Sequence, residues 1–528
     1  MSRRDIDVLV MQGRQALAAG AFAEARERYQ AILRLDSAQP RAWLALSAIA
    51  QRNGDFRDSV RTARSAVPSW KQSGSQQFIT ELSMRLLVLG EYKEARDLIS
   101  SADWSDPIVL RYSMGLVQYL GLAEAHQEAL ELADHAISRI GNAPSTLLFA
   151  RANALRYLGR MQEATEAYER CIAMDPLHAE AHWSLAHHAP SIPSGARVPR
   201  IRKAISHTQS SSEEAIYLQY ALFKELDDAG DSLEAWRVLE AVSRSKRRLV
   251  RYADSEGELT YRTLMEVCDA DFLARGRGRE SAQATGFNPI FIVGLPRSGT
   301  TVLERMLGNH PRITLAGELN DFQLQMSWEA NRFIGEFPDA GVLRSMLDVD
   351  FASLGKNYLK RTAWRLQEGA SHLVDKLPNN ILHAGFIRRA LPDAKLVCLR
   401  RNMMDSCFST FKHLFSGAAY PYSYDLTEMA GHYQRFARLA AHWQSLMPEN
   451  FMIVDYDDLV EHPGDVLARV AQFCDLPFQH DMADIERNRA PSATASSSQV
   501  REGVHTRNIG SWRRYENQLA GLLEYSPG

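Results

Sequence analysis

The sequence predicts two folds in one chain: an α-helical repeat array, followed by an α/β domain built on a parallel sheet. Three observations carry this prediction. A pattern of glycine, small and aromatic residues recurs through the first half with a period near 34 residues. Strand-like and helix-like segments alternate through the second half. Between them, just after residue 288, an apolar run enters a glycine-containing loop and then a helical pattern.

The composition is that of a globular protein with more than one domain. The chain has 528 residues, of which 45% are hydrophobic and 24% charged, and its net charge is −3. Its length predicts roughly two to four domains. The charge balance does not favour binding to nucleic acid or to an anionic membrane. No apolar run approaches the roughly 20 residues of a membrane span, so we expect none.

The cysteines indicate a reducing compartment. They are five in number, scattered, and without metal-ligand spacing. We therefore expect buried thiols, a cytoplasmic location and no metal site. The five are Cys171, Cys268, Cys398, Cys407 and Cys474.

Each repeat places a small residue five positions after a glycine. The clear copies are Gly20 with Ala25, Gly54 with Ser59, Gly90 with Ala95, and Gly159 with Ala164. A looser copy surrounds Gly121, with about three extra residues before Ala129, and Gly230 to Trp236 is a degenerate one. The pattern resembles tetratricopeptide repeats, helix pairs that stack into a solenoid. We expect an array over residues 1–250 that recruits a protein partner or substrate, a polar linker over 251–285, and a second domain over 286–528.

The loop after the apolar run Ile290–Val293 predicts a phosphate site. Backbone N–H groups at a helix start and the helix dipole favour an oxyanion. The spacing from Gly294 to Gly299 is that of a Walker A loop, but Thr300 stands where the lysine of an NTPase would be. This substitution favours a terminal 5′-phosphate over a triphosphate–metal complex.

The run Pro296–Thr301, PRSGTT, resembles the 5′-phosphosulfate loop of sulfotransferases that use 3′-phosphoadenosine 5′-phosphosulfate. The tyrosylprotein sulfotransferase-like branch is the most similar, and the resemblance covers about residues 288–515. It implies a P-loop-like α/β sulfotransferase domain that binds this co-substrate and uses no metal. The implied donor-binding residues of the loop are Arg297, Ser298, Gly299, Thr300 and Thr301.

Two further motifs follow in the family's order. DKLPNN, Asp375–Asn380, is similar to the lysine-bearing segment, which implies that Lys376 stabilises charge on the transferring group. The strand that ends at Arg400 and Arg401 is similar to the 3′-phosphate-binding segment, which implies Arg401 and, eight residues on, Ser409 as ligands. Because the family's usual Arg-Asp is Arg-Asn here, Arg400 remains an alternative. His413 stands where relatives carry another basic residue.

Glu318, in the run AGELND, matches the general base of the tyrosylprotein-type enzymes. Many other sulfotransferases use a histidine instead, and His310 and His383 are the alternatives in this chain.

The late segment 496–515 resembles the loop that closes over the donor. There Ser496 or Ser497 matches a serine that supports the transition state, and Tyr456, earlier in the chain, matches a donor-contacting tyrosine. The remaining implied donor-lining residues are Ser497, Gln499, Val500 and Arg501.

Together these residues predict an enzyme that transfers a sulfuryl group to a hydroxyl acceptor, with peptide tyrosine as one candidate acceptor and a carbohydrate, lipid or small metabolite as others. Two other classes stay open. One is a kinase or NTPase that uses the same loop, and the other is an inactive nucleotide-binding scaffold that acts through its repeats.

Overall fold

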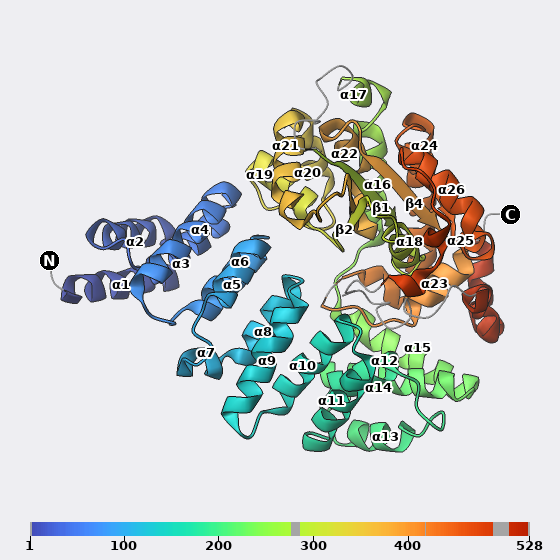
Figure 1. Ribbon diagram of the computed structural model, residues 1–528, viewed down its shortest axis with the longest axis horizontal. Coiled ribbons are helices and arrows are strands. Elements are labelled where there is room, and N and C mark those ends of the chain that lie inside the picture. Colours follow the sequence, from blue (N-terminus) through green and yellow to red (C-terminus); the bar gives the residue numbers. More distant parts are fainter. Residues whose placement is uncertain (1–2, 276–285, 418, 489–505, 526–528) are drawn as a thin grey trace. The chain divides into compact units, whose positions relative to one another are not determined.

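A computed structural model describes residues 3–275, 286–417, 419–488 and 506–525 (Figure 1). The chain divides into two compact units. The first contains residues 1–167 and 323–335, and the second contains residues 168–322 and 336–528. The boundary falls within helix α11 (Met161–Met174). The last predicted repeats therefore belong to the same compact unit as the α/β domain.

The first unit is built from consecutive helix pairs, as the repeat pattern predicts. Helix α1 packs on α2, α3 on α4, α5 on α6, and α8 on α9. The helices are α1 (Arg3–Ala18), α2 (Phe22–Leu35), α3 (Pro40–Arg52), α4 (Phe56–Ser73), α5 (Ile79–Val88), α6 (Tyr92–Ser100), α7 (Pro107–Arg111), α8 (Ser113–Leu122), α9 (His126–Ile140) and α10 (Ser145–Tyr157).

The repeat glycines lie at the turns between paired helices. Gly20, Gly54, Gly90 and Gly159 all have φ between 73° and 80°, a range that glycine adopts at little cost. The small residue five positions later is buried in each copy, as Ala25 and Ala164 show. In the looser copy the turn is made by Glu124, with φ 60°, and Gly121 lies inside helix α8. Glu124 is five residues before Ala129, which accounts for the three extra residues.

The second unit begins with helices α12 (Ala179–His188), α13 (Val198–Ser206), α14 (Glu213–Asp228) and α15 (Ser232–Leu249). Part of the expected linker is helical: α16 (Asp254–Val267) packs against α24 (Leu426–Leu446), and α17 (Ala270–Ala274) follows it. Residues 276–285 lie outside the described residues.

A five-stranded parallel sheet forms the centre of the second unit. The strands are β1 (Asn288–Gly294), β2 (Ile313–Leu315), β3 (His372–Lys376), β4 (Lys395–Arg400) and β5 (Phe451–Asp455), in the order β2-β3-β1-β4-β5. The helices between and after them in the chain are α18 (Thr300–Leu307), α19 (Asp321–Ala330), α20 (Ala340–Ser345), α21 (Phe351–Thr362), α22 (Ala384–Ala390), α23 (Met403–Phe411), α25 (Tyr456–Glu461), α26 (Pro463–Phe473) and α27 (Glu516–Leu519). From residue 323 onward, α19 belongs to the first unit. The predicted parallel sheet is confirmed.

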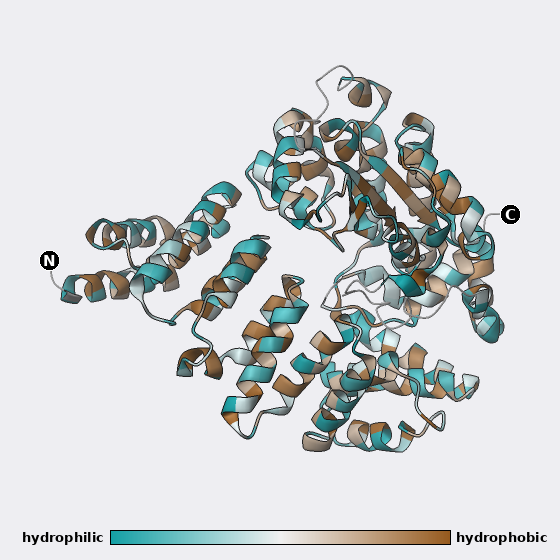
Figure 2. Ribbon diagram, viewed as in Figure 1, coloured by the Kyte–Doolittle hydropathy of each residue, from teal (hydrophilic) through white to brown (hydrophobic). Residues whose placement is uncertain are grey.

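Both faces of the sheet are buried. Ile290 and Ile292 of β1 pack with residues of α18 and α26 on one face. Phe291 points to the other face, where it contacts Phe322 and Tyr358. The middle residues of the strands are accordingly mostly apolar (Figure 2). Among the described residues, no helix has both the length and the hydropathy needed to cross a membrane.

The strand order places a ligand site at one edge of the sheet. The chain passes from β3, on one side of β1, to β4, on the other, so β1 marks the point where the order reverses. In sheets of this kind the crevice for a ligand lies beyond the carboxyl ends of the strands at that point. Gly294, Lys376 and Arg400 end the three strands concerned.

Candidate active site

The loop between β1 and α18 leaves room for an anion. Gly299 has φ 102°, and a Cβ atom there would lie 2.2 Å from a ring carbon of Tyr456. Only glycine fits this position. Arg297 also has a positive φ, 65°, and the Ser298 hydroxyl donates to the Leu295 carbonyl at 2.8 Å. The backbone N–H groups at the start of α18 have no partners within the helix, so they suit an oxyanion.

Two arginines meet at this loop. Arg401 Nη1 donates to the carbonyl of Arg297 at 3.2 Å, and the Arg401 guanidinium lies 4.7 Å from the centre of the Tyr456 ring. Burial and the charge of Arg401 lower the pKa of Arg297 to about 10. Among the described residues nothing accepts a hydrogen bond from Arg401 Nε, although this atom is buried. An anion between the two guanidinium groups would relieve both the repulsion and the missing hydrogen bond.

Arg400 has a different role. Its guanidinium donates to both carboxylate oxygens of Asp455, at 2.7 and 2.8 Å, and its side chain is half exposed. This geometry favours Arg401 over Arg400 as the phosphate ligand.

A third cation near the loop is Lys412, which directly follows helix α23. The helix rests on the loop through Thr410, whose hydroxyl donates to the carbonyl of Pro296 at 3.2 Å, and the neighbouring Ser409 is buried. Burial, together with the charges of Arg297, Lys224 and Arg401, lowers the pKa of Lys412 to about 8, although the charge of Asp227 opposes the fall. No sequence motif marks Lys412, because a lysine that follows a helix is usually solvated.

Lys376 and Glu318, which are 58 positions apart in the chain, are in contact. Strand β3 places Lys376 fully buried at its end, and the Lys376 backbone N–H donates to the carbonyl of Gly317 at 2.9 Å. Nζ of Lys376 donates to Glu318 and lies 3.8 Å from a carboxylate oxygen of Glu304. Burial raises the pKa of Glu304, and Lys376 opposes the rise. The structure therefore joins two predicted catalytic residues and adds Glu304, which the sequence did not single out.

A second carboxylate lies near Glu318. Asn379, in the DKLPNN motif, donates to Glu336, and burial raises the pKa of Glu336. Tyr420 has φ 51°, a strained value for a bulky residue. Burial raises the pKa of Tyr420 well above its usual value, and the charges of Glu318 and Glu336 add to the rise. No sequence motif pointed to Glu336 or Tyr420.

The alternative bases are less suited to proton abstraction. His310 uses both ring nitrogens, one with the carbonyl of Pro477 at 3.2 Å and the other accepting from the N–H of Arg312 at 3.1 Å. His383 is 2% exposed, and burial lowers its pKa to about 4. The Glu318 side chain is 42% exposed and can meet an acceptor.

Part of the expected site lies outside the described residues: Ser496, Ser497, Gln499, Val500 and Arg501. The described end of the late segment contacts the predicted 3′-phosphate ligand. Arg401 Nη2 donates to the carbonyl of Asn508, and the N–H of Gly510 donates to Asp405 at 2.7 Å.

Comparison with known proteins identifies the domain that carries this site. The model of the sulfotransferase family matches residues 289–480, and that of the tetratricopeptide repeat matches residues 145–178. This chain carries a sulfotransferase-family domain. The predicted resemblance to both families is confirmed.

This chain is also similar to individual proteins of several organisms. A protein of Aquifex aeolicus, described as uncharacterized, is 25% identical over 98% of this chain and 69% of its own length. A putative protein-tyrosine sulfotransferase of Caenorhabditis briggsae is 24% identical over 42% of this chain and 80% of its own. The protein-tyrosine sulfotransferase of Drosophila melanogaster is 24% identical over 42% of this chain and 46% of its own length. Among solved structures, the sulfotransferase domain of the Synechococcus PCC 7002 olefin synthase is 18% identical over 48% of this chain and 98% of its own, with a TM-score of 0.32.

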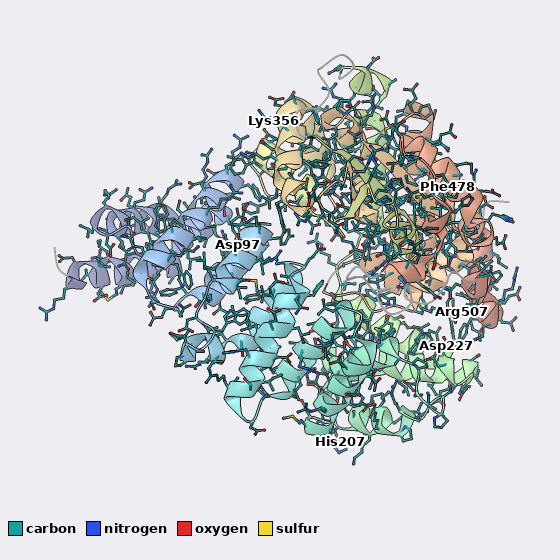
Figure 3. The ribbon with its side chains drawn as sticks, in the orientation of Figure 1. Asp97, His207, Asp227, Lys356, Phe478 and Arg507 are labelled. Carbon is teal, nitrogen blue, oxygen red and sulfur yellow. The ribbon has the colours of Figure 1, made fainter. Side chains whose placement is uncertain are left out.

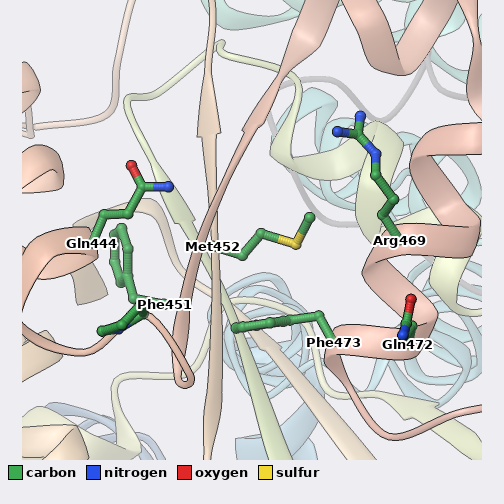
Figure 4. Close-up of a pocket in the computed structure, with 7 residues that line it drawn as sticks. Gln444, Phe451, Met452, Arg469, Gln472 and Phe473 are labelled. Atoms are coloured by element: carbon green, nitrogen blue, oxygen red, sulfur yellow. The ribbon is translucent and has the colours of Figure 1, made fainter.

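Two of the surface depressions lined by described residues lie in the sulfotransferase domain. One, of about 430 Å³, is lined by Arg401, Tyr456 and their neighbours, beside the loop. The other, of about 390 Å³, lies beside β5 and contains none of the predicted site residues (Figure 4). Within the described ranges, no group of three or more His, Cys, Asp and Glu side chains is placed to hold a metal ion.

Proposed function

We propose that the sulfotransferase domain transfers a sulfuryl group from 3′-phosphoadenosine 5′-phosphosulfate to a hydroxyl acceptor. The contact between Lys376 and Glu318, at the same sheet edge as the phosphate loop, carries this proposal. A buried cation and an exposed carboxylate at the end of β3 support the proposal, because the phosphate loop begins at the end of the neighbouring strand β1.

The residues of the loop fit the donor. The backbone after Gly299 and the side chains of Arg297, Thr300 and Thr301 would hold the 5′-phosphosulfate. Arg401 and Ser409 would hold the 3′-phosphate, and Tyr456 would line the site. The donor supplies an activated sulfuryl group with a nucleotide phosphate as leaving group.

Lys376 and Glu318 divide the chemistry between them. Glu318 accepts the proton of the acceptor hydroxyl as the new O–S bond forms. Lys376 stabilises the negative charge that develops on the leaving phosphate oxygen as the old S–O bond breaks. Because Lys376 contacts Glu318 in this structure, its movement towards the donor would free the carboxylate to act as base. Glu304, 3.8 Å from the lysine Nζ, would help to hold the lysine in place.

The acceptor is proposed to be a hydroxyl of a peptide or protein tyrosine. The names of the Caenorhabditis and Drosophila relatives support this class. The repeat array would recruit the acceptor or a partner protein, as helical repeats commonly do. A cytoplasmic site of action remains our prediction.

Two assays of the purified full chain test this function. Calorimetry should show binding of 3′-phosphoadenosine 5′-phosphate without Mg²⁺, and tighter binding of ATP–Mg²⁺ would instead favour a kinase or NTPase. Donor carrying radiolabelled sulfate should then label a tyrosine peptide in preference to saccharides and small alcohols. Nucleotide binding without labelling of any acceptor would favour the inactive scaffold.

A further inference from the structure

The end of repeat helix α14 is tied to the C-terminal part of the chain. Asp227, labelled in Figure 3, accepts hydrogen bonds from Arg514 Nη1 and from the Tyr515 hydroxyl, each at 2.8 Å. The Asp227 backbone carbonyl accepts a further bond from Arg514 at 3.1 Å. The Asp227 side chain is only 13% exposed. A carboxylate that is largely buried and doubly bonded fixes its partners more firmly than a surface pair does.

An aromatic contact reinforces this tie. The Trp236 ring of α15 lies 5.5 Å from the Tyr515 ring and 5.9 Å from that of Phe411, at the end of α23. Phe408 of α23 lies 5.1 Å from Tyr515. The last repeat therefore packs on both the C-terminal segment and the helix that carries Ser409.

The same C-terminal segment holds the predicted 3′-phosphate ligand. Asn508 accepts from Arg401, and Asp405, which is 3.8 Å from Arg401, accepts from Gly510 and from the Ser511 hydroxyl at 3.2 Å. Gly510 has φ 68° and allows the turn that presents these donors. A continuous set of contacts thus runs from Asp227 through residues 508–515 to the Arg401 guanidinium.

We propose that Asp227, in the repeat array, is a positioning residue for donor binding: it anchors residues 508–515, which fix Arg401 in the orientation that receives the 3′-phosphate. This inference rests on the proposed function. A guanidinium held in place before the ligand arrives loses less conformational freedom on binding. The last repeat is then part of the nucleotide site as well as part of the array. Any ligand of the array that shifts the end of α14 would change donor affinity, and donor would change that ligand's affinity equally.

The test compares two ties between the last repeats and the sulfotransferase domain. Asp227→Asn removes the charge from the tie to residues 514 and 515 and leaves one amide oxygen as acceptor. Glu428→Gln makes the same change in a comparable tie, because Glu428 of α24 accepts from Arg247 of α15 twice, each bond at 2.7 Å. The first tie leads to the Arg401 guanidinium through residues 508–515, whereas α24 contacts the Arg401 backbone carbonyl, which accepts from the Tyr433 hydroxyl at 2.8 Å.

Calorimetry with 3′-phosphoadenosine 5′-phosphate should show about tenfold weaker binding by the full-length Asp227→Asn variant, from the loss of a charge-assisted hydrogen bond. Glu428→Gln should bind like wild type. The KM for donor should rise by a similar factor in Asp227→Asn, with kcat within about twofold of wild type. Tyr515→Phe, which leaves the Asp227–Arg514 pair in place, should weaken binding by a smaller factor and serves if Asp227→Asn fails to fold.

Three results would overturn the inference: wild-type affinity in Asp227→Asn, equal weakening by Glu428→Gln, or a fall in kcat alone. If wild type itself does not bind the bisphosphate, the proposed function fails instead.

Discussion

The two ends of the candidate site differ in the balance between cationic and carboxylate side chains. At the loop, Arg297, Arg401 and Lys412 gather three cations, and Arg401 is held largely by backbone carbonyl oxygens. At the end of β3 a single buried cation, Lys376, contacts two carboxylates. The first end has an excess of positive charge that a bound anion can neutralise. The second already contains its counter-charges, so it is suited to moving a proton. Donor binding is thus assigned to the loop after β1, and proton transfer to the end of β3.

The largest effect is expected from the base. Glu318→Gln should lower kcat by about 10²–10⁴-fold, because the amide cannot take the acceptor's proton. Affinity for 3′-phosphoadenosine 5′-phosphate should stay within about twofold of wild type. Steady-state turnover and calorimetry measure the two quantities. Glu336→Gln is the control, since it alters the neighbouring carboxylate and leaves Glu318 intact. A larger loss of turnover in the control would transfer the role of base to Glu336.

Removal of the lysine should affect both catalysis and stability. Lys376→Ala should lower kcat by about 10²–10³-fold, from lost stabilisation of the leaving group. It should also lower the free energy of unfolding by about 3 kcal/mol, because it leaves Glu304 buried without a cation. Urea unfolding measures the second effect. Adding Glu304→Gln should restore stability but not turnover, and recovery of both would show that the lysine is structural.

Substitutions at the phosphate loop should have smaller effects, and these should appear in donor affinity. Arg297→Ala and Arg401→Ala should each weaken the binding of 3′-phosphoadenosine 5′-phosphate by about 10–100-fold. This is the contribution of one or two charge-assisted hydrogen bonds. Arg400→Ala is the matched control, because that side chain is already bound by Asp455. If calorimetry gave the two site variants wild-type affinity, the assignment of this end would be wrong.

The smallest effect concerns pH. The pKa of Lys412 is lowered to about 8 from its usual 10.5. As pH rises from 7 to 9 the ammonium loses its proton, so affinity for the bisphosphate should fall by about threefold to tenfold. Stability should change in the opposite direction: between pH 8 and 10.5 the unfolded chain binds more protons than the folded one, so this group makes stability rise with pH. Lys412→Arg should abolish the pH dependence of affinity, and its persistence would assign it to another group.

The sequence was sufficient for features set by local pattern. The periodic glycines predicted the helix pairs, and the sequence patterns before the phosphate loop and before Arg401 predicted β1 and β4. It also singled out Lys376 and Glu318, since each lies in a motif near a strand end. It could not show that they touch, which depends on the pairing of β2 with β3.

Other features have no local signal. Glu304 looks like an ordinary helix residue until α18 is packed against β3. The sequence pattern points to Gly121 as the turn residue of the looser repeat. The turn is made by Glu124, and a non-glycine residue rarely adopts a positive φ. Asp227 is separated by 288 positions from Tyr515, and no periodicity reports a contact at that distance.

The boundary between compact units inside α11 limits how the chain can be cut. A fragment that began at residue 286 would expose the faces of Phe411 and Tyr515 that Trp236 covers, and would remove the Tyr261 ring that packs on His432 at 5.6 Å. Newly exposed aromatic surface of this kind favours aggregation. Loss of activity in such a fragment would therefore report damage to the nucleotide site as readily as loss of acceptor recruitment. Substitutions on the surface of α1–α10 can separate these two causes, whereas truncation cannot.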